Sequence, residues 1–193
     1  MQLARRRLAD NPGALLTALI KQIDAGSLHA YEGSEEQKLL QEVITAAGPA
    51  GLDAVLAKMD SGSWRLQMDF RGWITTLYPA GDLIGWVGQS LDRARLVASL
   101  VGIGDGPPSE VVQFLLTNFG TDDQVSSSLY GDFVTGSWWG NESVHLNGQI
   151  AQLETWVGDP SQSAGVKRWA REVTANLKRR REVVLLEEAE EDR

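Results

Sequence analysis

The residue pair whose spacing best suits chemistry is Glu142 and His145. They stand three apart at the expected start of a helix, so both could face one ligand, and a carboxylate beside an imidazole can form an acid/base couple. A metal site needs more ligands, and the other histidine, His29, lies in a separate expected loop. We therefore expect His145 to cap or bridge the preceding loop, Glu142 to serve the helix amino terminus electrostatically, and the chain to hold no catalytic residue, cofactor or metal.

The loop "GSWWGNES" places Trp138 and Trp139 side by side between glycines. Adjacent side chains cannot both point to one helix face, and the glycines permit tight turns. We expect both indoles to pack where the last helical hairpin meets the carboxy-terminal helices. The alternative is that one indole fills the core and the other is an exposed anchor, because exposed tryptophan is a frequent interface hot spot.

The segment "VKRWAREVTANLKRRR" joins basic residues to a tryptophan, and it could contact nucleic-acid phosphates. The alternatives are a charged helix facing a protein partner, or basic residues that favour the helix dipole and pair with the acidic run after them. A net charge of -8 argues against a general nucleic-acid coat. The candidate partner-binding residues are Trp138, Trp139, Glu142, His145, Trp169, Lys178, Arg179, Arg180 and Arg181.

Composition excludes several classes of site. With no cysteine, the chain has no disulfide, thiolate metal site or cysteine nucleophile, which fits a reducing cytosol. No stretch reaches the roughly 20 apolar residues of a membrane span, so we expect a cytoplasmic protein without membrane contact. The glycine-rich "VGIGDGPPSE" lacks a lysine followed by serine or threonine, so it predicts an ordinary turn and not a phosphate loop.

The elements that must position these residues are helices. Apolar residues recur at helical spacing, and Ser34 with Gln37 three residues later forms the pattern of a capping box. The later stripes predict two long carboxy-terminal helices: Leu146, Ile150, Leu153 and Trp156, then Val166, Trp169, Ala170, Val173 and Leu177.

A repeat of about 30 residues runs through the middle of the chain. Each copy has a proline at the start of a short apolar helix, where its missing N–H costs nothing, and then an aspartate suited to cap a second helix. One such hairpin cannot cover its own apolar face, so successive hairpins must stack. The prolines are Pro49, Pro79 and Pro108, and the aspartates are Asp60, Asp92 and Asp123.

With Arg95 three residues after Asp92, these hairpins resemble HEAT repeats, although Asp123 has no matching arginine. The resemblance covers about residues 49–134 and implies an all-α fold of antiparallel hairpins stacked as a short HEAT-like α-solenoid. We divide the chain into amino-terminal helices (1–48), hairpins (49–134), the tryptophan-rich loop with carboxy-terminal helices (135–186), and a disordered acidic tail (187–193). The "VVLL" before that tail puts apolar side chains on more than one helix face, and it should be covered by the repeats, by another subunit or by a second copy.

The carboxy-terminal stretch from "FVTGSWWGNES" to "NLKRR" is similar to the helical tails of large bacterial multidomain proteins, several of them in antiphage defence. This resemblance implies a scaffold or sensor and transfers no catalytic residue. We therefore expect a non-enzymatic interaction module that binds a protein, either another subunit or itself. The alternatives are a nucleic-acid-binding repeat protein, which needs Arg5 to Arg7 near Lys178 to Arg181, and an enzyme with Glu142 and His145, or Asp122 and Asp123, in a cleft.

Overall fold

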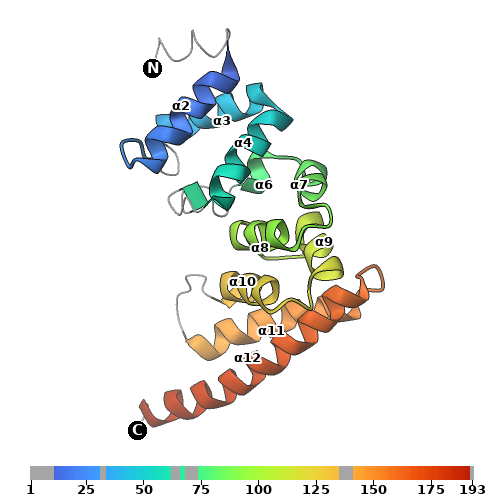
Figure 1. The fold of residues 1–193 in the computed structure, drawn as a ribbon. Coiled ribbons are helices and arrows are strands. Elements are labelled where there is room, and N and C mark those ends of the chain that lie inside the picture. The colour runs from blue at the N-terminus through green and yellow to red at the C-terminus, as the bar shows by residue number, and fades with distance from the viewer. Residues whose placement is uncertain (1–10, 31–33, 62–65, 68–73, 135–140, 192–193) are drawn as a thin grey trace. The chain divides into compact units, whose positions relative to one another are not determined.

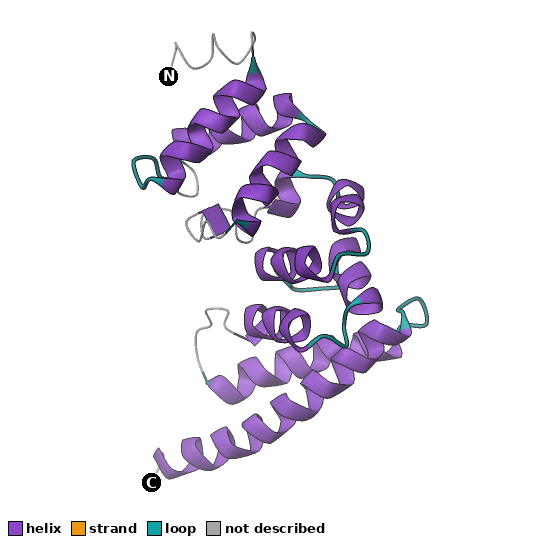
Figure 2. Cartoon of the chain, in the orientation of Figure 1, coloured by secondary structure: helices purple, strands orange, loops and turns teal. Residues whose placement is uncertain are grey.

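The protein is all-α, as predicted. The computed structural model describes residues 11–30, 34–61, 66–67, 74–134 and 141–191, and the regular elements in those ranges are α-helices (Figures 1 and 2). The chain divides into two compact units, Met1–Val101 and Gly102–Arg193.

The first unit buries an aliphatic core between its first three described helices. Leu40, Val43 and Ile44 of α3 are fully buried, as are Val55 and Leu56 of α4. The helices of this unit are α2 (Pro12–Asp24), α3 (Glu35–Ala47), α4 (Pro49–Asp60), α6 (Ile74–Leu77), α7 (Ala80–Val87) and α8 (Leu91–Leu100). No single described helix is both long and apolar enough to cross a membrane, although α3 and α4, bent by 118°, pass a test of length and composition as a pair.

The helix starts follow the sequence signals in part. Ser34 Oγ accepts from the N–H of Gln37 at 3.0 Å, which confirms the predicted serine cap. The predicted caps at Asp92 and Asp123 are wrong, because a neighbouring residue caps the helix in each case. Ser90 caps α8, and Asp122 Oδ1 accepts from two N–H groups of α10, each at 3.1 Å.

The second unit contains α9 (Glu110–Asn118), α10 (Asp123–Val134), α11 (Glu142–Gly158) and α12 (Ala164–Glu191). Helices α11 and α12 run antiparallel and side by side (Figure 1). Their contact buries both predicted stripes, including Leu153, Trp156 and Leu177. An aromatic cluster closes this core, in which Trp169 stacks on Trp156 with the ring centroids 6.3 Å apart and meets the ring of Phe133 edge-on.

The acidic tail differs from its predicted disorder. Helix α12 is 28 residues long and continues through the acidic run to Glu191. Its end is fixed to the start of α11, where the Glu188 carboxylate accepts from Ser143 Oγ at 2.7 Å and from the Ser143 N–H at 3.2 Å. This tertiary contact gives order to a segment whose composition alone predicts fraying.

Candidate functional site

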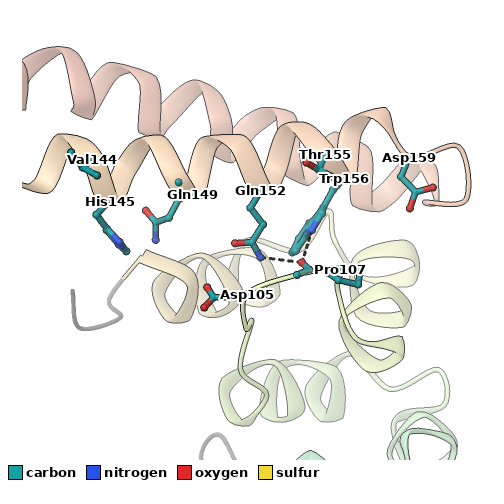
Figure 3. Close-up of a pocket in the computed structure, with 11 residues that line it drawn as sticks. Asp105, Pro107, Val144, His145, Gln149, Gln152, Thr155, Trp156 and Asp159 are labelled. Carbon is teal, nitrogen blue, oxygen red and sulfur yellow. Dashed lines mark hydrogen bonds between the residues drawn. The ribbon is translucent and has the colours of Figure 1, made fainter. Parts of the chain in front are cut away.

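A groove of about 560 Å³ lies in the second unit, between α11 and the loop before α9 (Figure 3). Helix α11 lines it with one face, at positions three or four apart from Val144 to Asp159, and the loop lines it with residues 105–107. In Figure 3, His145, Gln149 and Gln152 point from α11 toward the side where Asp105 and Pro107 lie. The lining is mainly apolar with a few polar groups, which is the usual composition of a binding site.

Side chains of α11 hold the loop wall of the groove in place. Gln152 Nε2 donates to the carbonyls of Gly104 and Gly106, at 2.8 and 3.0 Å, and Trp156 Nε1 donates to the carbonyl of Gly106 at 2.8 Å. Gly106 has a φ of 130°, a backbone conformation open mainly to glycine. At the start of the loop, the Ile103 N–H donates to Asp132 Oδ2 of α10 at 2.7 Å. The groove is therefore a built feature of this unit and does not depend on a loose loop.

Gln149, which lines the groove, carries a buried acceptor without a partner among the described residues. Gln149 is 7% exposed, and its Nε2 donates to the carbonyl of Phe133 at 2.6 Å. Its Oε1 has no hydrogen-bond partner in the part of the chain that the structure describes. A buried acceptor without a partner costs free energy.

The ionisable groups of the groove do not form the acid/base couple that the sequence suggested. The groove lining contains His145, but among the described residues it does not contain Glu142, Asp122 or Asp123. The Glu142 carboxylate instead accepts two hydrogen bonds from Arg180, from Nε at 3.0 Å and from Nη2 at 3.3 Å. These bonds and the charge of Glu142 hold the pKa of the Arg180 guanidinium above its usual value.

At the far end of the groove, Asp159 organises the turn into α12. Hydrogen bonds from the hydroxyl and the N–H of Ser161, at 2.7 and 2.8 Å, hold the pKa of the Asp159 carboxyl below its usual value. Among the described residues, no group of three or more histidine, aspartate or glutamate side chains could hold a metal ion.

Three tryptophans are among the predicted site residues, and the structure describes one of them. Trp138 and Trp139 lie outside the described residues. The prediction that Trp169 contacts a partner is wrong, because its indole is buried against Trp156 and Phe133. The helical stripe that contains Trp169 already indicated that position, and its basic neighbours gave the opposite signal.

The four basic residues of α12 that were candidate partner contacts, Lys178 to Arg181, all have contacts within this unit. Lys178 pairs with Glu154 of α11 at 2.8 Å, and Arg180 pairs with Glu142. Arg181 Nη1 donates to Asn147 Oδ1 at 3.0 Å, and Arg179 donates to Asn176 Oδ1 at 2.9 Å on its own helix. These contacts position α12 along α11, which is a structural role for the basic run.

Sequence analysis missed the groove itself. His145, Gln149 and Gln152 form a second stripe on α11, at spacings of four and three, beside the predicted core stripe, and Trp156 belongs to both. Polar residues at helical spacing next to the core stripe were the available signal for a second, partly polar face.

Comparison with known proteins adds no family: no protein-family model, curated protein or solved structure matches this chain.

Proposed function

We propose that the chain is a protein-interaction module, and that the groove along α11 binds an apolar segment of a partner protein. The observation that carries the proposal is the combination of an open, mainly apolar groove with the buried acceptor of Gln149. An extended segment can supply both an apolar side chain for the groove and a free backbone N–H, to which the Gln149 amide can turn its Oε1.

Val144 supports a macromolecular partner. It lines the groove and is 68% exposed, so its side chain is open to a partner. A small ligand enclosed in the groove would leave Val144 in water, whereas a partner chain lying along α11 would cover it.

The wider setting that we propose is a scaffold subunit in a cytoplasmic bacterial defence complex, with α7–α8 and α9–α10 as HEAT-like hairpins of a short α-solenoid. The support is the resemblance of the repeat and of the "GSWWGNES" region to such proteins. Pro79 is the N-cap residue of α7, and Pro108 directly precedes Ser109, the N-cap residue of α9.

The alternative is a nucleic-acid-binding repeat protein. Its support is the basic run from Lys178 to Arg181. The pairing of Lys178 and Arg180 with acidic residues of α11 counts against it, because an engaged cation has less to offer a phosphate. Arg5 to Arg7, which this alternative also needs, lie outside the described residues.

Site-specific photocrosslinking in cells tests the groove. A benzophenone amino acid at Val144 should capture one protein reproducibly, whereas the same group at Ala151, exposed on α11 and outside the groove lining, should not. The captured protein is identified by mass spectrometry.

A blocking variant makes this experiment decisive. Gly148 lines the groove, and a Cβ there would meet no atom within 4 Å, so Gly148→Phe fills the groove without disturbing the helix backbone. We expect the adduct at Val144 to disappear in this variant while the circular dichroism spectrum is unchanged. An adduct that survives Gly148→Phe, or equal capture at Ala151, would rule out the groove as the binding site, and capture of nucleic acid alone would favour the alternative.

A further inference from the structure

The carboxy-terminal third of α12 exposes apolar side chains that the rest of the helix does not. Val184 is 2% exposed and lies in the core, while Val183, Leu185 and Leu186 are 47%, 48% and 69% exposed. These three are most of the large apolar residues exposed in the described part of the chain, and Val183 and Leu186, three positions apart, adjoin on one face of the helix. Such a patch marks an interface more often than chance exposure.

Four residues of this segment form one stripe on the outer side of α12. Arg179, Val183, Leu186 and Glu190 are separated by four, three and four residues, which places them in line along a helix. All four are exposed, and they lie opposite the buried Val184. We call these four residues the outer stripe.

The outer stripe is complementary to itself when it is reversed. Read in the opposite direction, the order Arg, Val, Leu, Glu becomes Glu, Leu, Val, Arg, so the spacing is unchanged and each charge meets its opposite. A two-fold axis between Val184 and Leu185 therefore sets Val183 of one chain against Leu186 of the other, and Arg179 against Glu190.

We propose that α12 binds a second copy of this chain through the outer stripe, in an antiparallel two-helix contact. Its centre is apolar and its two ends are ion pairs between Arg179 and Glu190. The described contacts of Arg179, with Asn176 and the carbonyl of Ala175, are within its own helix and leave the guanidinium exposed. A two-fold contact of this kind uses one surface twice and closes at the dimer.

The positions beside the outer stripe agree with this register. In an antiparallel pair, the residues on one flank of the stripe face the residues on the same flank of the second chain. On one flank, this places Arg180 of one chain near Glu187 of the other. On the other side Glu182 falls near Ala189 of the second chain. Neither flank brings like charges together.

The contact is short, about 18 Å along the helix, so it buries less than the roughly 1,600 Å² of a standard interface. We expect a dissociation constant in the range of about 1 to 100 µM. The proposal does not depend on the groove, and a groove variant such as Gly148→Phe should dimerise as the unaltered chain does.

Charge reversal tests the proposal by sedimentation equilibrium between about 5 and 500 µM. Arg179→Glu and Glu190→Arg each place like charges at both ends of the contact, and each should raise the dissociation constant at least about tenfold. An equimolar mixture of the two variants restores both ion pairs and should form a one-to-one dimer. Arg168→Glu, the same charge change at an exposed position of α12 outside the outer stripe, is the matched control and should dimerise normally.

A chain that stays monomeric to 500 µM would overturn the proposal, as would a dimer that both reversals leave unchanged. If the single variants are monomeric and their mixture is too, the antiparallel register is wrong. Because all the altered positions are exposed on a helix, circular dichroism should show each variant folded, and an unfolded variant is replaced by Arg179→Gln or Glu190→Gln, which should weaken the dimer less.

The natural absence of cysteine gives a second test, which reports direction. Mixed Val183→Cys and Leu186→Cys chains should form a disulfide-linked heterodimer under mild oxidation, because these positions face each other across the two-fold axis. Either variant alone should crosslink far less. Efficient crosslinking of Val183→Cys with itself would indicate a parallel contact and overturn the antiparallel one.

Discussion

At the scale of single residues, two helical glycines of the second unit have opposite surroundings. A Cβ on Gly165 would lie 2.8 Å from the Thr117 Cα and against the backbone of Leu116, so α12 and α9 approach too closely for any side chain. A Cβ on Gly148 would meet no atom within 4 Å. The first glycine is required by packing, and the second leaves room in the groove.

We therefore predict opposite effects of the same substitution. Gly165→Ala forces backbone atoms apart and should lower the free energy of unfolding by about 1–3 kcal/mol. Gly148→Ala removes backbone freedom from the unfolded chain at no steric cost and should raise it by about 0.5–1 kcal/mol. Urea denaturation followed by circular dichroism measures both, each variant serving as the other's control, and equal destabilisation by the two would contradict this account.

The residues that sequence analysis placed well are those whose role is set by neighbours on the same helix. Ser34 caps α3 through Gln37, three residues away, and Leu153 is buried by its place in a stripe. Trp169 was assigned two roles, and only the core role was correct. The basic residues around Trp169 do not determine the direction of its indole. Its place in the apolar stripe of α12 predicts that direction, and it predicts burial.

At the scale of elements, the start of α11 is stabilised by a residue far away in the chain. Asn141 stands at the N-cap position but makes no side-chain cap hydrogen bond. The Glu188 carboxylate of α12 takes that role through the N–H and hydroxyl of Ser143. A carboxylate at a helix amino terminus also interacts favourably with the helix dipole.

Glu188→Ala should therefore lower the free energy of unfolding by about 1–2 kcal/mol. It should also speed hydrogen exchange in two places, the first turn of α11 and the last turns of α12, because one contact holds both. Glu187→Ala is the matched control. Its carboxylate lies 4.0 Å from Arg180 on an exposed surface, so its removal should cost less than about 1 kcal/mol. Faster exchange at only one of the two helix ends would show that Glu188 does not couple them.

The groove also depends on contacts between residues far apart in the chain, and for this reason it was not predicted. Periodicity identifies α11 and its core face, but the opposite wall is a loop that returns to the helix across about 45–50 residues, held by Gln152 and Trp156. Backbone carbonyls of glycine, which accept these bonds, leave no trace in side-chain patterns. The helical order of the acidic run was missed for the same reason, since it depends on the contact between Glu188 and Ser143.

At the scale of the whole molecule, the chain holds two compact units with separate cores. In the first, most of the buried side chains are aliphatic, as at Leu40 and Ile44 of α3. In the second, an aromatic cluster around Trp169 joins α10, α11 and α12. The repeat in the sequence predicts stacked hairpins, and a pattern of proline and aspartate does not indicate which residues belong to each compact unit.

A unit with its own core is expected to fold without the rest of the chain. We predict that residues 102–193, expressed alone, give a helical circular dichroism spectrum and a single cooperative thermal transition. Within this fragment, Leu153→Ala should lower the free energy of unfolding by about 2–5 kcal/mol, because Leu153 is fully buried between α11 and α12. Val144→Ala, at a mostly exposed position of the same helix, is the matched control and should change it by less than about 0.5 kcal/mol. All melts are compared at one protein concentration, since self-association through α12 would raise the midpoint as concentration rises. A fragment that is helical but unfolds without a cooperative transition would show that residues 102–193 need the first unit to complete their core.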